Sequence, residues 1–284
     1  MIPAPFEYHR PDSVDAAVRL MSSLGEGARV VAGGHSLVPM MKMRMTDIAH
    51  LVDLQGIGAL RGISVDGASV RIGAMTTQHE LITSEALAKA APIIREASLQ
   101  IADPQVRYMG TIGGNVANGD PGNDMPGLMQ CLDATYDLTG PGGNRSVKAR
   151  AFYEAAYFTA RGDDEILTAI RFAAKPCGYA YEKQKRKIGD YATAAAAVTI
   201  EKSNGRCTAA SIAMTNLSDT PVFCAEAAAA LVGTALDQAA LGKAVEAMLG
   251  AINPTEDNRG PVEFKRHVAG VILRRAIERA ASRA

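Results

Sequence analysis

An excess of charge of either sign is missing from this sequence of 284 residues: Lys and Arg together number 30, and so do Asp and Glu. A protein that holds nucleic acid by bulk electrostatics needs a positively charged surface. Long apolar runs are missing too, and none approaches the roughly 20 residues with which a helix spans a bilayer. The sequence therefore predicts no nucleic-acid partner and no integral membrane segment.

Cysteine is scarce, and its four positions are Cys131, Cys177, Cys207 and Cys224. These spacings fit no metal or iron–sulfur ligand set. The first residues, 1–6, lack the charged and apolar regions of a secretory signal peptide, which predicts a cytoplasmic protein. Because disulfides are rare in that compartment, we expect the cysteines to be buried or incidental thiols. Because their spacings fit no ligand set, we expect no metal bound by this chain.

Two glycine pairs are the most informative feature. The first, Ala32-Gly33-Gly34-His35-Ser36, follows β-branched residues and precedes a helical pattern, where Ser36 is placed as N-cap. Glycines allow close backbone approach, and the N–H groups of such turns form a nest for an anion. The second, Thr111-Ile112-Gly113-Gly114-Asn115, has the same character. Together they predict one ligand with two phosphates; the alternative is two tight turns without a ligand.

The hydrophobic periodicity predicts a mixed fold, α/β at first and α+β at the end. The expected helices cover 14–24, 37–44, 78–89, 92–102, 124–133, 224–232, 237–251 and 261–282. The expected strands cover 28–31, 50–54, 63–65, 69–72, 135–138, 146–149, 165–172, 179–185, 198–201 and 207–212. Alternation is lost at 173–176, which predicts a boundary between residues 1–175 and 176–284. The first part divides into about 1–56 and 57–175, and the second is a three-stranded sheet covered by helices.

A few segments have side chains suited to ligand chemistry. Residues 103–124 are rich in Gly, Asn, Asp and Pro, which is typical of a long loop that lines a ligand-binding site. His35 is either a ligand contact or structural, since no catalytic partner accompanies it. Asp124 either binds ribose hydroxyls or caps a helix. The basic run 183–187 is a solvated strand face or a docking surface, and Tyr191 either packs in a core or covers a flat cofactor.

Family resemblance rests on both glycine loops and on three further segments: Ile101-Ala102-Asp103-Pro104-Gln105, Asn118-Gly119-Asp120-Pro121-Gly122-Asn123-Asp124-Met125-Pro126 and Lys185-Arg186-Lys187-Ile188-Gly189-Asp190-Tyr191-Ala192-Thr193-Ala194. Over essentially its whole length the chain resembles the FAD-binding flavoproteins of the molybdenum hydroxylases, and among them the medium subunits of aerobic carbon monoxide dehydrogenases. The resemblance implies a PCMH-type FAD-binding region of two subdomains, followed by a flavoprotein C-terminal domain.

The resemblance also implies FAD as the cofactor and suggests its contacts. The pyrophosphate would be held by Ala32, Gly33, Gly34, His35, Ser36 and Leu37 and by Thr111, Ile112, Gly113, Gly114 and Asn115. By the same resemblance Ile101 and Ala102 would line the flavin pocket, Asp124 would bind the adenosine ribose, Tyr191 would lie against the isoalloxazine, and Lys187 would contact the cofactor. No catalytic residue is expected in this chain, because the cofactor performs the electron chemistry.

Partner subunits are part of what the resemblance implies. In this family a large subunit holds the molybdenum cofactor and a small subunit carries two [2Fe–2S] clusters, in a dimer of heterotrimers. This chain would be the oxidoreductase subunit that takes electrons onto FAD and passes them to a quinone or a cytochrome. Such a complex is expected in the cytoplasm, with at most peripheral contact to the inner face of the membrane.

Other functions stay open at this point. A related molybdenum hydroxylase acting on an aldehyde or an N-heterocycle would use a similar flavin subunit, since the substrate binds on another chain. A free-standing flavin oxidase would need a base beside the flavin, which the sequence does not offer. A non-redox binding module would leave both glycine loops without a purpose.

Overall fold

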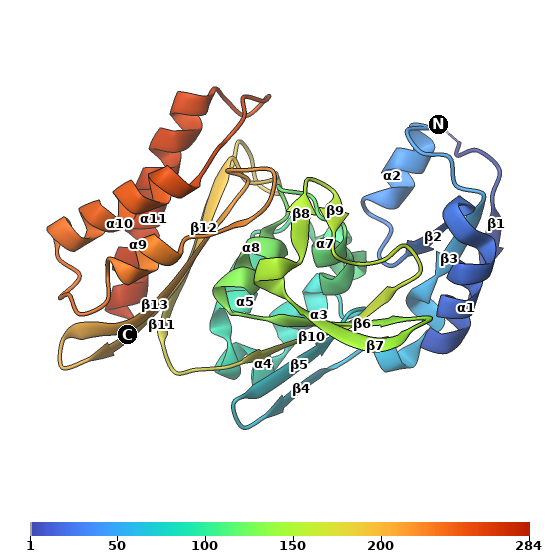
Figure 1. The fold of residues 1–284 in the computed structure, drawn as a ribbon, viewed down its shortest axis with the longest axis horizontal. Helices are drawn as coiled ribbons and strands as arrows, with labels where there is room; N and C mark the ends of the chain where they lie inside the picture. The colour runs from blue at the N-terminus through green and yellow to red at the C-terminus, as the bar shows by residue number, and fades with distance from the viewer. Residues whose placement is uncertain (1) are drawn as a thin grey trace.

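Three sheets organise residues 2–284, which are the residues that the computed structural model describes (Figure 1). The first sheet has three strands from residues 7–53, the second has five strands from residues 63–173, and the third has four strands from residues 178–223. Figure 1 shows the third sheet standing between the C-terminal helices and the middle of the molecule, with the first sheet at the opposite end.

The first sheet is parallel and has the order β1 (Glu7–His9), β3 (His50–Asp53), β2 (Ala28–Val31). It is covered by α1 (Val14–Leu24), and α2 (Leu37–Lys42) follows β2. The hydroxyl of Ser13 caps α1, as its position before the helical pattern indicates. β1 is absent from the sequence-based expectation because three residues give no periodic signal. The helix expected to run to Arg44 ends earlier, and Ser36 precedes it without a capping hydrogen bond.

The second sheet is antiparallel, with the order β4, β5, β10, β6, β7. These strands are Ile63–Asp66, Ser69–Gly73, Ile166–Ala173, Thr135–Gly140 and Gly143–Lys148, and a small pair, β8 (Tyr153–Ala155) and β9 (Phe158–Thr159), lies beside them. Its helices are α3 (Gln78–Thr83), α4 (Glu85–Ala90), α5 (Pro92–Ser98), α6 (Pro104–Met109), α7 (Ile112–Ala117) and α8 (Asp124–Cys131). Short 3-10 turns cover Gly25–Gly27, Leu54–Gly56, Gly58–Leu60 and Ala149–Ala151.

Capping residues explain where the expectation for this region is wrong. The single helix expected over 78–89 is divided because the Ser84 hydroxyl accepts from the N–H of Leu87 and starts α4. The segment 103–124, expected to be irregular, contains α6 and α7. Asp103 caps α6 and Thr111 caps α7 in the same way. Helices of six residues are too short to show a 3.6-residue period, so the sequence pattern misses them.

The third sheet is antiparallel and has the order β11 (Gly178–Gln184), β12 (Ala194–Ser203), β13 (Arg206–Thr215), β14 (Val222–Phe223). It has four strands where three are expected, because the two residues of β14 carry no alternation signal. Three helices cover one face: α9 (Ala225–Ala229), α10 (Gln238–Ala251) and α11 (Val262–Ser282). Among the described helices, none has both the length and the apolar character needed to cross a membrane.

Small side chains in β12 join two hydrophobic cores. Ala194 and Ala196 belong to the core formed with α10 and α11, whereas Ala195 and Ala197 belong to the core of the second sheet, which includes α8. Successive residues of a strand point to opposite faces, so this sheet is buried on both sides (Figure 1). The C-terminal part is therefore packed firmly against the rest of the chain.

Ala195→Leu tests the tight packing of that sheet. The side chain is fully buried, and inserting a larger one into a well-packed core costs about 1–3 kcal/mol. We expect urea denaturation to show a loss of this size in the free energy of unfolding. Ser203→Leu, at the exposed end of the same strand, is the matched control, and a surface change costs within about 0.5 kcal/mol. Equal effects of the two substitutions would contradict the two-core arrangement.

Candidate functional site

A cleft of about 510 Å³ has walls from all three sheets. It lies between the loop that follows β2, the segment of α6 and α7, and β11 with the loop after it. A volume of this size is typical of a site for a small molecule or cofactor. The predicted residues that line it are Ala32, Gly33, Gly34, His35, Ser36, Leu37, Ile101, Ala102, Thr111, Gly113, Gly114, Asn115, Asp124 and Tyr191. Sequence segments as far apart as Ala32 and Tyr191 thus meet in one place. Their contacts with a ligand stay predictions.

Two of the predicted residues lie elsewhere. Ile112 is fully buried in the core of the second sheet, so its side chain supports the loop from behind. Lys187 is exposed and outside the cleft lining, which includes Lys183 in its place. Of the basic run 183–187, the structure thus brings a different lysine to the cleft.

Open backbone amides distinguish the first glycine loop. Within residues 2–284, the N–H groups of residues 33–36 make no hydrogen bond. Gly34 has a φ of +76°, a left-handed conformation that glycine adopts without strain. His35 and Ser36 are both exposed. Successive N–H groups in such a turn form a concave site for an anion, so this loop can bind a phosphate through its backbone.

The second glycine motif, expected to be a loop, is instead the cap and first turn of α7, and its amides are already paired within the protein. The N–H of Ile112 donates to the carbonyl of Thr76 at 2.9 Å, and the N–H of Gly113 donates to the carbonyl of Ala74 at 2.8 Å. The N–H groups of Gly114 and Asn115 donate to Oγ1 and to the carbonyl of Thr111, each at 3.0 Å. Its glycines are explained by packing: a Cβ on Gly113 would lie 2.5 Å from the Cβ of Ala74. The two loops resemble each other in sequence, but only the first presents unpaired N–H groups to the cleft.

A buried ion pair forms the opposite wall. The carboxylate of Asp124 accepts hydrogen bonds from the hydroxyl of Tyr181 at 2.5 Å and from Nζ of Lys183 at 2.8 Å. Asp124 is the first residue of α8 and Asn123 is its cap, so the capping alternative for Asp124 is wrong. Burial, and then the charge of Asp124, raises the pKa of Tyr181 well above its usual value, so the hydroxyl stays a donor.

The carboxylate of Asp124 can accept a further hydrogen bond. Each carboxylate oxygen has two lone pairs, and one protein donor to each oxygen leaves Asp124 able to accept from a ligand hydroxyl. The sequence does indicate that Lys183 and Tyr181 lie on the same face of β11, because alternate residues of a strand share a face.

Gln78 is a cleft residue that the sequence analysis misses. Its side chain is 2% exposed, and within the described residues neither its amide oxygen nor its amide nitrogen has a hydrogen-bond partner. A buried polar group without a partner costs about 1–3 kcal/mol. Because Gln78 lines the cleft, a bound molecule with polar atoms would satisfy this amide. A glutamine at the start of a helix is too common a pattern for the sequence alone to identify this role.

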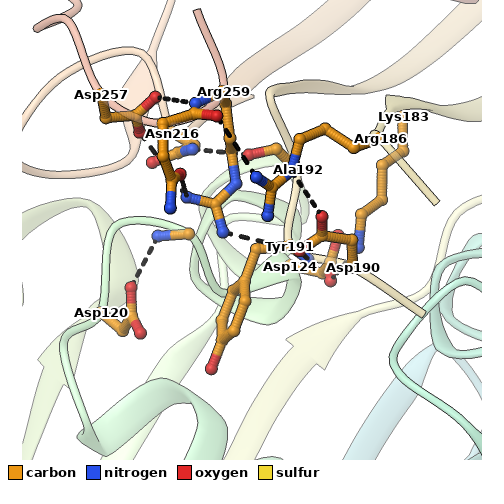
Figure 2. A network of polar contacts seen from close by, with 12 residues as sticks. Asp120, Asp124, Lys183, Arg186, Asp190, Tyr191, Ala192, Asn216, Asp257 and Arg259 are labelled. Atoms are coloured by element: carbon orange, nitrogen blue, oxygen red, sulfur yellow. Dashed lines mark hydrogen bonds and ion pairs between the residues drawn. The ribbon is translucent and has the colours of Figure 1, made fainter. Parts of the chain in front are cut away.

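Tyr191 lies at the cleft with its ring partly open to solvent. The residue is 42% exposed, unlike a core tyrosine, and its N–H donates to Oδ1 of Asp190 at 2.8 Å. Figure 2 shows Arg259 from the C-terminal part approaching this ring, with its guanidinium carbon 5.6 Å from the ring centroid. Burial, and then the charge of Asp120, raises the pKa of Tyr191. The ring is therefore neutral and suited to lie against a planar group.

Ion pairs hold the backbone next to this tyrosine (Figure 2). Asp190 pairs with Nε of Arg186 at 2.9 Å and with Nη2 of Arg259 at 3.6 Å. Burial alone would raise the pKa of Asp190, but the hydrogen bonds from Arg186 and from the Tyr191 backbone lower it. The carboxylate is thus charged at neutral pH and connects the loop after β11 to the segment between α10 and α11.

These features fit a dinucleotide such as FAD. The open amides of residues 33–36 suit a diphosphate, Asp124 suits a ribose hydroxyl, the unpartnered amide of Gln78 suits a polar group of the ligand, and the half-exposed ring of Tyr191 suits a flat aromatic system. His35 has no hydrogen-bond partner within residues 2–284, which leaves it without the carboxylate that orients a catalytic base.

Two family models match the sequence. Residues 4–174 match the FAD binding domain in molybdopterin dehydrogenase, and residues 179–280 match the CO dehydrogenase flavoprotein C-terminal domain. Together they cover both sides of the boundary expected near 173–176.

Known proteins are similar over the full length. The carbon monoxide dehydrogenase medium chain of Afipia carboxidovorans is 61% identical over 100% of this chain and 99% of its own length. A glyceraldehyde dehydrogenase medium chain of Sulfolobus acidocaldarius is 31% identical over 99% of this chain and 100% of its own. The solved structure of the reconstituted CO dehydrogenase from Oligotropha carboxidovorans superposes with a TM-score of 0.99, at 61% identity and with 100% of both chains covered.

Gln78→Leu tests the role of the unpartnered amide. The substitution keeps the size of the side chain and removes both polar atoms, so the cofactor-free protein should be as stable as before or more stable. Loss of one hydrogen bond to FAD should raise its Kd about five- to tenfold. Fluorescence titration with FAD and a thermal melt measure the two effects.

Gln130→Leu is the matched control. Gln130 also has a buried unpartnered amide oxygen, but it does not line the cleft. FAD affinity should be unchanged in this variant. The assignment of Gln78 would be refuted by an FAD affinity that is the same in both variants and the wild type.

Proposed function

This chain belongs to the carbon monoxide dehydrogenase medium-chain family of FAD-binding oxidoreductase subunits, and on that premise we propose that it transfers electrons within a molybdenum-containing carbon monoxide dehydrogenase. In this proposal the chain receives electrons from [2Fe–2S] clusters of a small partner subunit. A large partner subunit holds the molybdenum cofactor and oxidises carbon monoxide. The observation that carries the proposal is the cleft, which fits a dinucleotide, in a chain without iron–sulfur ligands of its own.

The cysteines support the need for partners. All four are free, and three of them, Cys131, Cys207 and Cys224, are buried. Burial raises the pKa of Cys131 and of Cys224 to about 12, so these thiols are protonated, whereas clusters bind thiolates. Within residues 2–284 no group of cysteines has metal-ligand geometry. This supports the proposal that the iron–sulfur clusters lie on another chain.

The residues of the cleft position the cofactor. Bound FAD supplies the redox chemistry, and the N–H groups of residues 33–36 would hold its diphosphate. The carboxylate of Asp124, oriented by Lys183, would accept from a ribose hydroxyl. The ring of Tyr191 would exclude water from one face of the isoalloxazine, and the pairing of Asp190 with Arg259 holds the loop that carries this ring.

The acceptor and the location are further parts of the proposal. Electrons leave FAD for a quinone or a cytochrome, as the family resemblance implies. The complex is a cytoplasmic dimer of heterotrimers with at most peripheral contact to the inner face of the membrane. The resemblance of residues 185–194 and of both glycine loops to the carbon monoxide subunits supports this assembly.

Two alternatives are weaker. A flavin subunit for an aldehyde hydroxylase is supported by the 31% identical glyceraldehyde dehydrogenase medium chain, against 61% for the carbon monoxide relative. A free-standing flavin oxidase needs a base paired with an orienting group beside the flavin. Within the described residues, the exposed His35 has no such partner.

Reconstitution tests the proposed division of labour. The isolated chain should not reduce an artificial dye with carbon monoxide, because it has no site that oxidises this substrate. The complex with the large and small subunits should do so. Turnover by the isolated chain would refute the proposal, and a complex that oxidises aldehydes but not carbon monoxide would favour the first alternative.

Tyr191→Ala tests the ring against the flavin. Removing the ring admits water and changes the polarity beside the isoalloxazine, which should shift the two-electron potential of FAD by about 30 mV, equivalent to about 1.4 kcal/mol. Tyr191→Phe keeps the ring and should change the potential much less. A redox titration of both holoenzyme variants measures the shift.

Tyr179→Ala is the control, because that ring lies against Arg283 and outside the cleft. It should lower thermal stability without changing the flavin potential. An unchanged potential in Tyr191→Ala at full FAD content would show that Tyr191 does not cover the flavin.

A further inference from the structure

Two histidines and a glutamate meet on the first sheet, away from the cleft. Glu7 and His9 belong to β1, and His50 is the residue paired with Glu7 on β3. Nε2 of His9 lies 3.2 Å from Nδ1 of His50. Oε2 of Glu7 lies 3.3 Å from the same His50 atom and 3.9 Å from Nε2 of His9. Three potential ligand atoms thus converge on one point.

Two of these separations, 3.2 Å and 3.3 Å, are close to the edges of a metal coordination shell, and the third, 3.9 Å, is longer, so the exposed Glu7 side chain would move slightly to bind an ion. Zn²⁺ binds imidazole nitrogen and carboxylate oxygen at about 2.0–2.2 Å, so ligands on one tetrahedral ion lie about 3.3–3.6 Å apart. Imidazole favours Zn²⁺ and its transition-metal neighbours, whereas Mg²⁺ and Ca²⁺ prefer oxygen. We propose that Glu7, His9 and His50 form a binding site for a divalent transition-metal ion of the zinc class.

The surroundings suit an accessible but partly sheltered ion. Each histidine side chain is 24% exposed, and that of Glu7 is 73% exposed. One carboxylate and two neutral imidazoles leave a bound divalent ion with a net positive charge and with a coordination position open to water. The site therefore resembles, in ligand number, the open three-ligand zinc sites of proteins.

The position in the fold indicates what the ion would do. β1 has only three residues and pairs on one side only, as an edge strand of the sheet. An ion shared between β1 and β3 would clip this short edge strand to the central strand. His50 pairs with Ala28 at the start of β2, whereas the open-amide loop follows the other end of β2. The proposed metal site and the open-amide loop therefore lie at opposite ends of β2.

The sequence alone does not reveal this site. His9 and His50 are 41 positions apart, which matches no spacing of known metal-binding motifs. The expectation that this chain binds no metal rested on the cysteine spacing, and only the pairing of β1 with β3 brings the two imidazoles together.

Equilibrium dialysis of the full-length chain against Zn²⁺ tests the proposal. A Cys177→Ser background removes the least buried thiol as a competing ligand. We expect one saturable equivalent of Zn²⁺, resistant to excess Mg²⁺, and an upward shift of Tm on binding. Co²⁺ in place of Zn²⁺ should give visible absorption bands, a signature that a hydrogen-bonded histidine pair cannot produce.

Single substitutions identify the ligands. His9→Gln, His50→Gln and Glu7→Gln should each weaken Zn²⁺ binding about 10-fold or more, since even changes behind the ligands cost that much. Glu7 is exposed, so Glu7→Gln leaves the fold intact even where a histidine variant is less stable. His267→Gln, on the exposed surface of α11, should bind Zn²⁺ as the parent does. Absence of a saturable site, or unchanged affinity in any of the three ligand variants, would overturn the proposal.

Discussion

The close approach of Gly33 to the backbone of Met109 and Gly110 is the contact on which the cleft depends. A Cβ on Gly33 would overlap the carbonyl of Met109 and lie 2.8 Å from the Cα of Gly110. Any other residue would push the first glycine loop away from the segment that leads into α7. The loop held in this way lines the cleft, and within residues 2–284 the N–H groups of residues 33–36 have no hydrogen-bond partner.

A second constraint is the sheet with a core on each face. The alternating alanines of β12 let α8 and α11 pack on opposite sides of it, and the neighbouring strand β11 carries Lys183 to the cleft. The ion pair between Lys183 and Asp124 therefore joins the C-terminal part to α8, which begins at Asp124. A cofactor bound there would contact both parts.

Much of this architecture could be predicted from the sequence, and the failures have physical causes. α1 was predictable from Ser13 and a clear helical period, and the hairpin of β4 and β5 from Asp66-Gly67. β1, β14 and the six-residue helices are too short to be periodic. The first glycine motif forms the expected loop, but the second is the first turn of α7, and no sequence pattern reveals that the amides of 112–115 are paired within the protein. Whether Gln78 and Lys183 line the cleft depends on which face of their helix or strand points to it, and only the packing of the elements decides that.

The central claim is that the backbone of the first glycine loop holds the diphosphate. An experimental structure of the FAD-loaded protein would measure this most directly, through the distances from the phosphate oxygens to the nitrogens of residues 33–36. The account predicts that at least two of these distances lie within about 3.2 Å, with the second loop contributing side chains rather than its paired amides. A diphosphate far from all four nitrogens would contradict it.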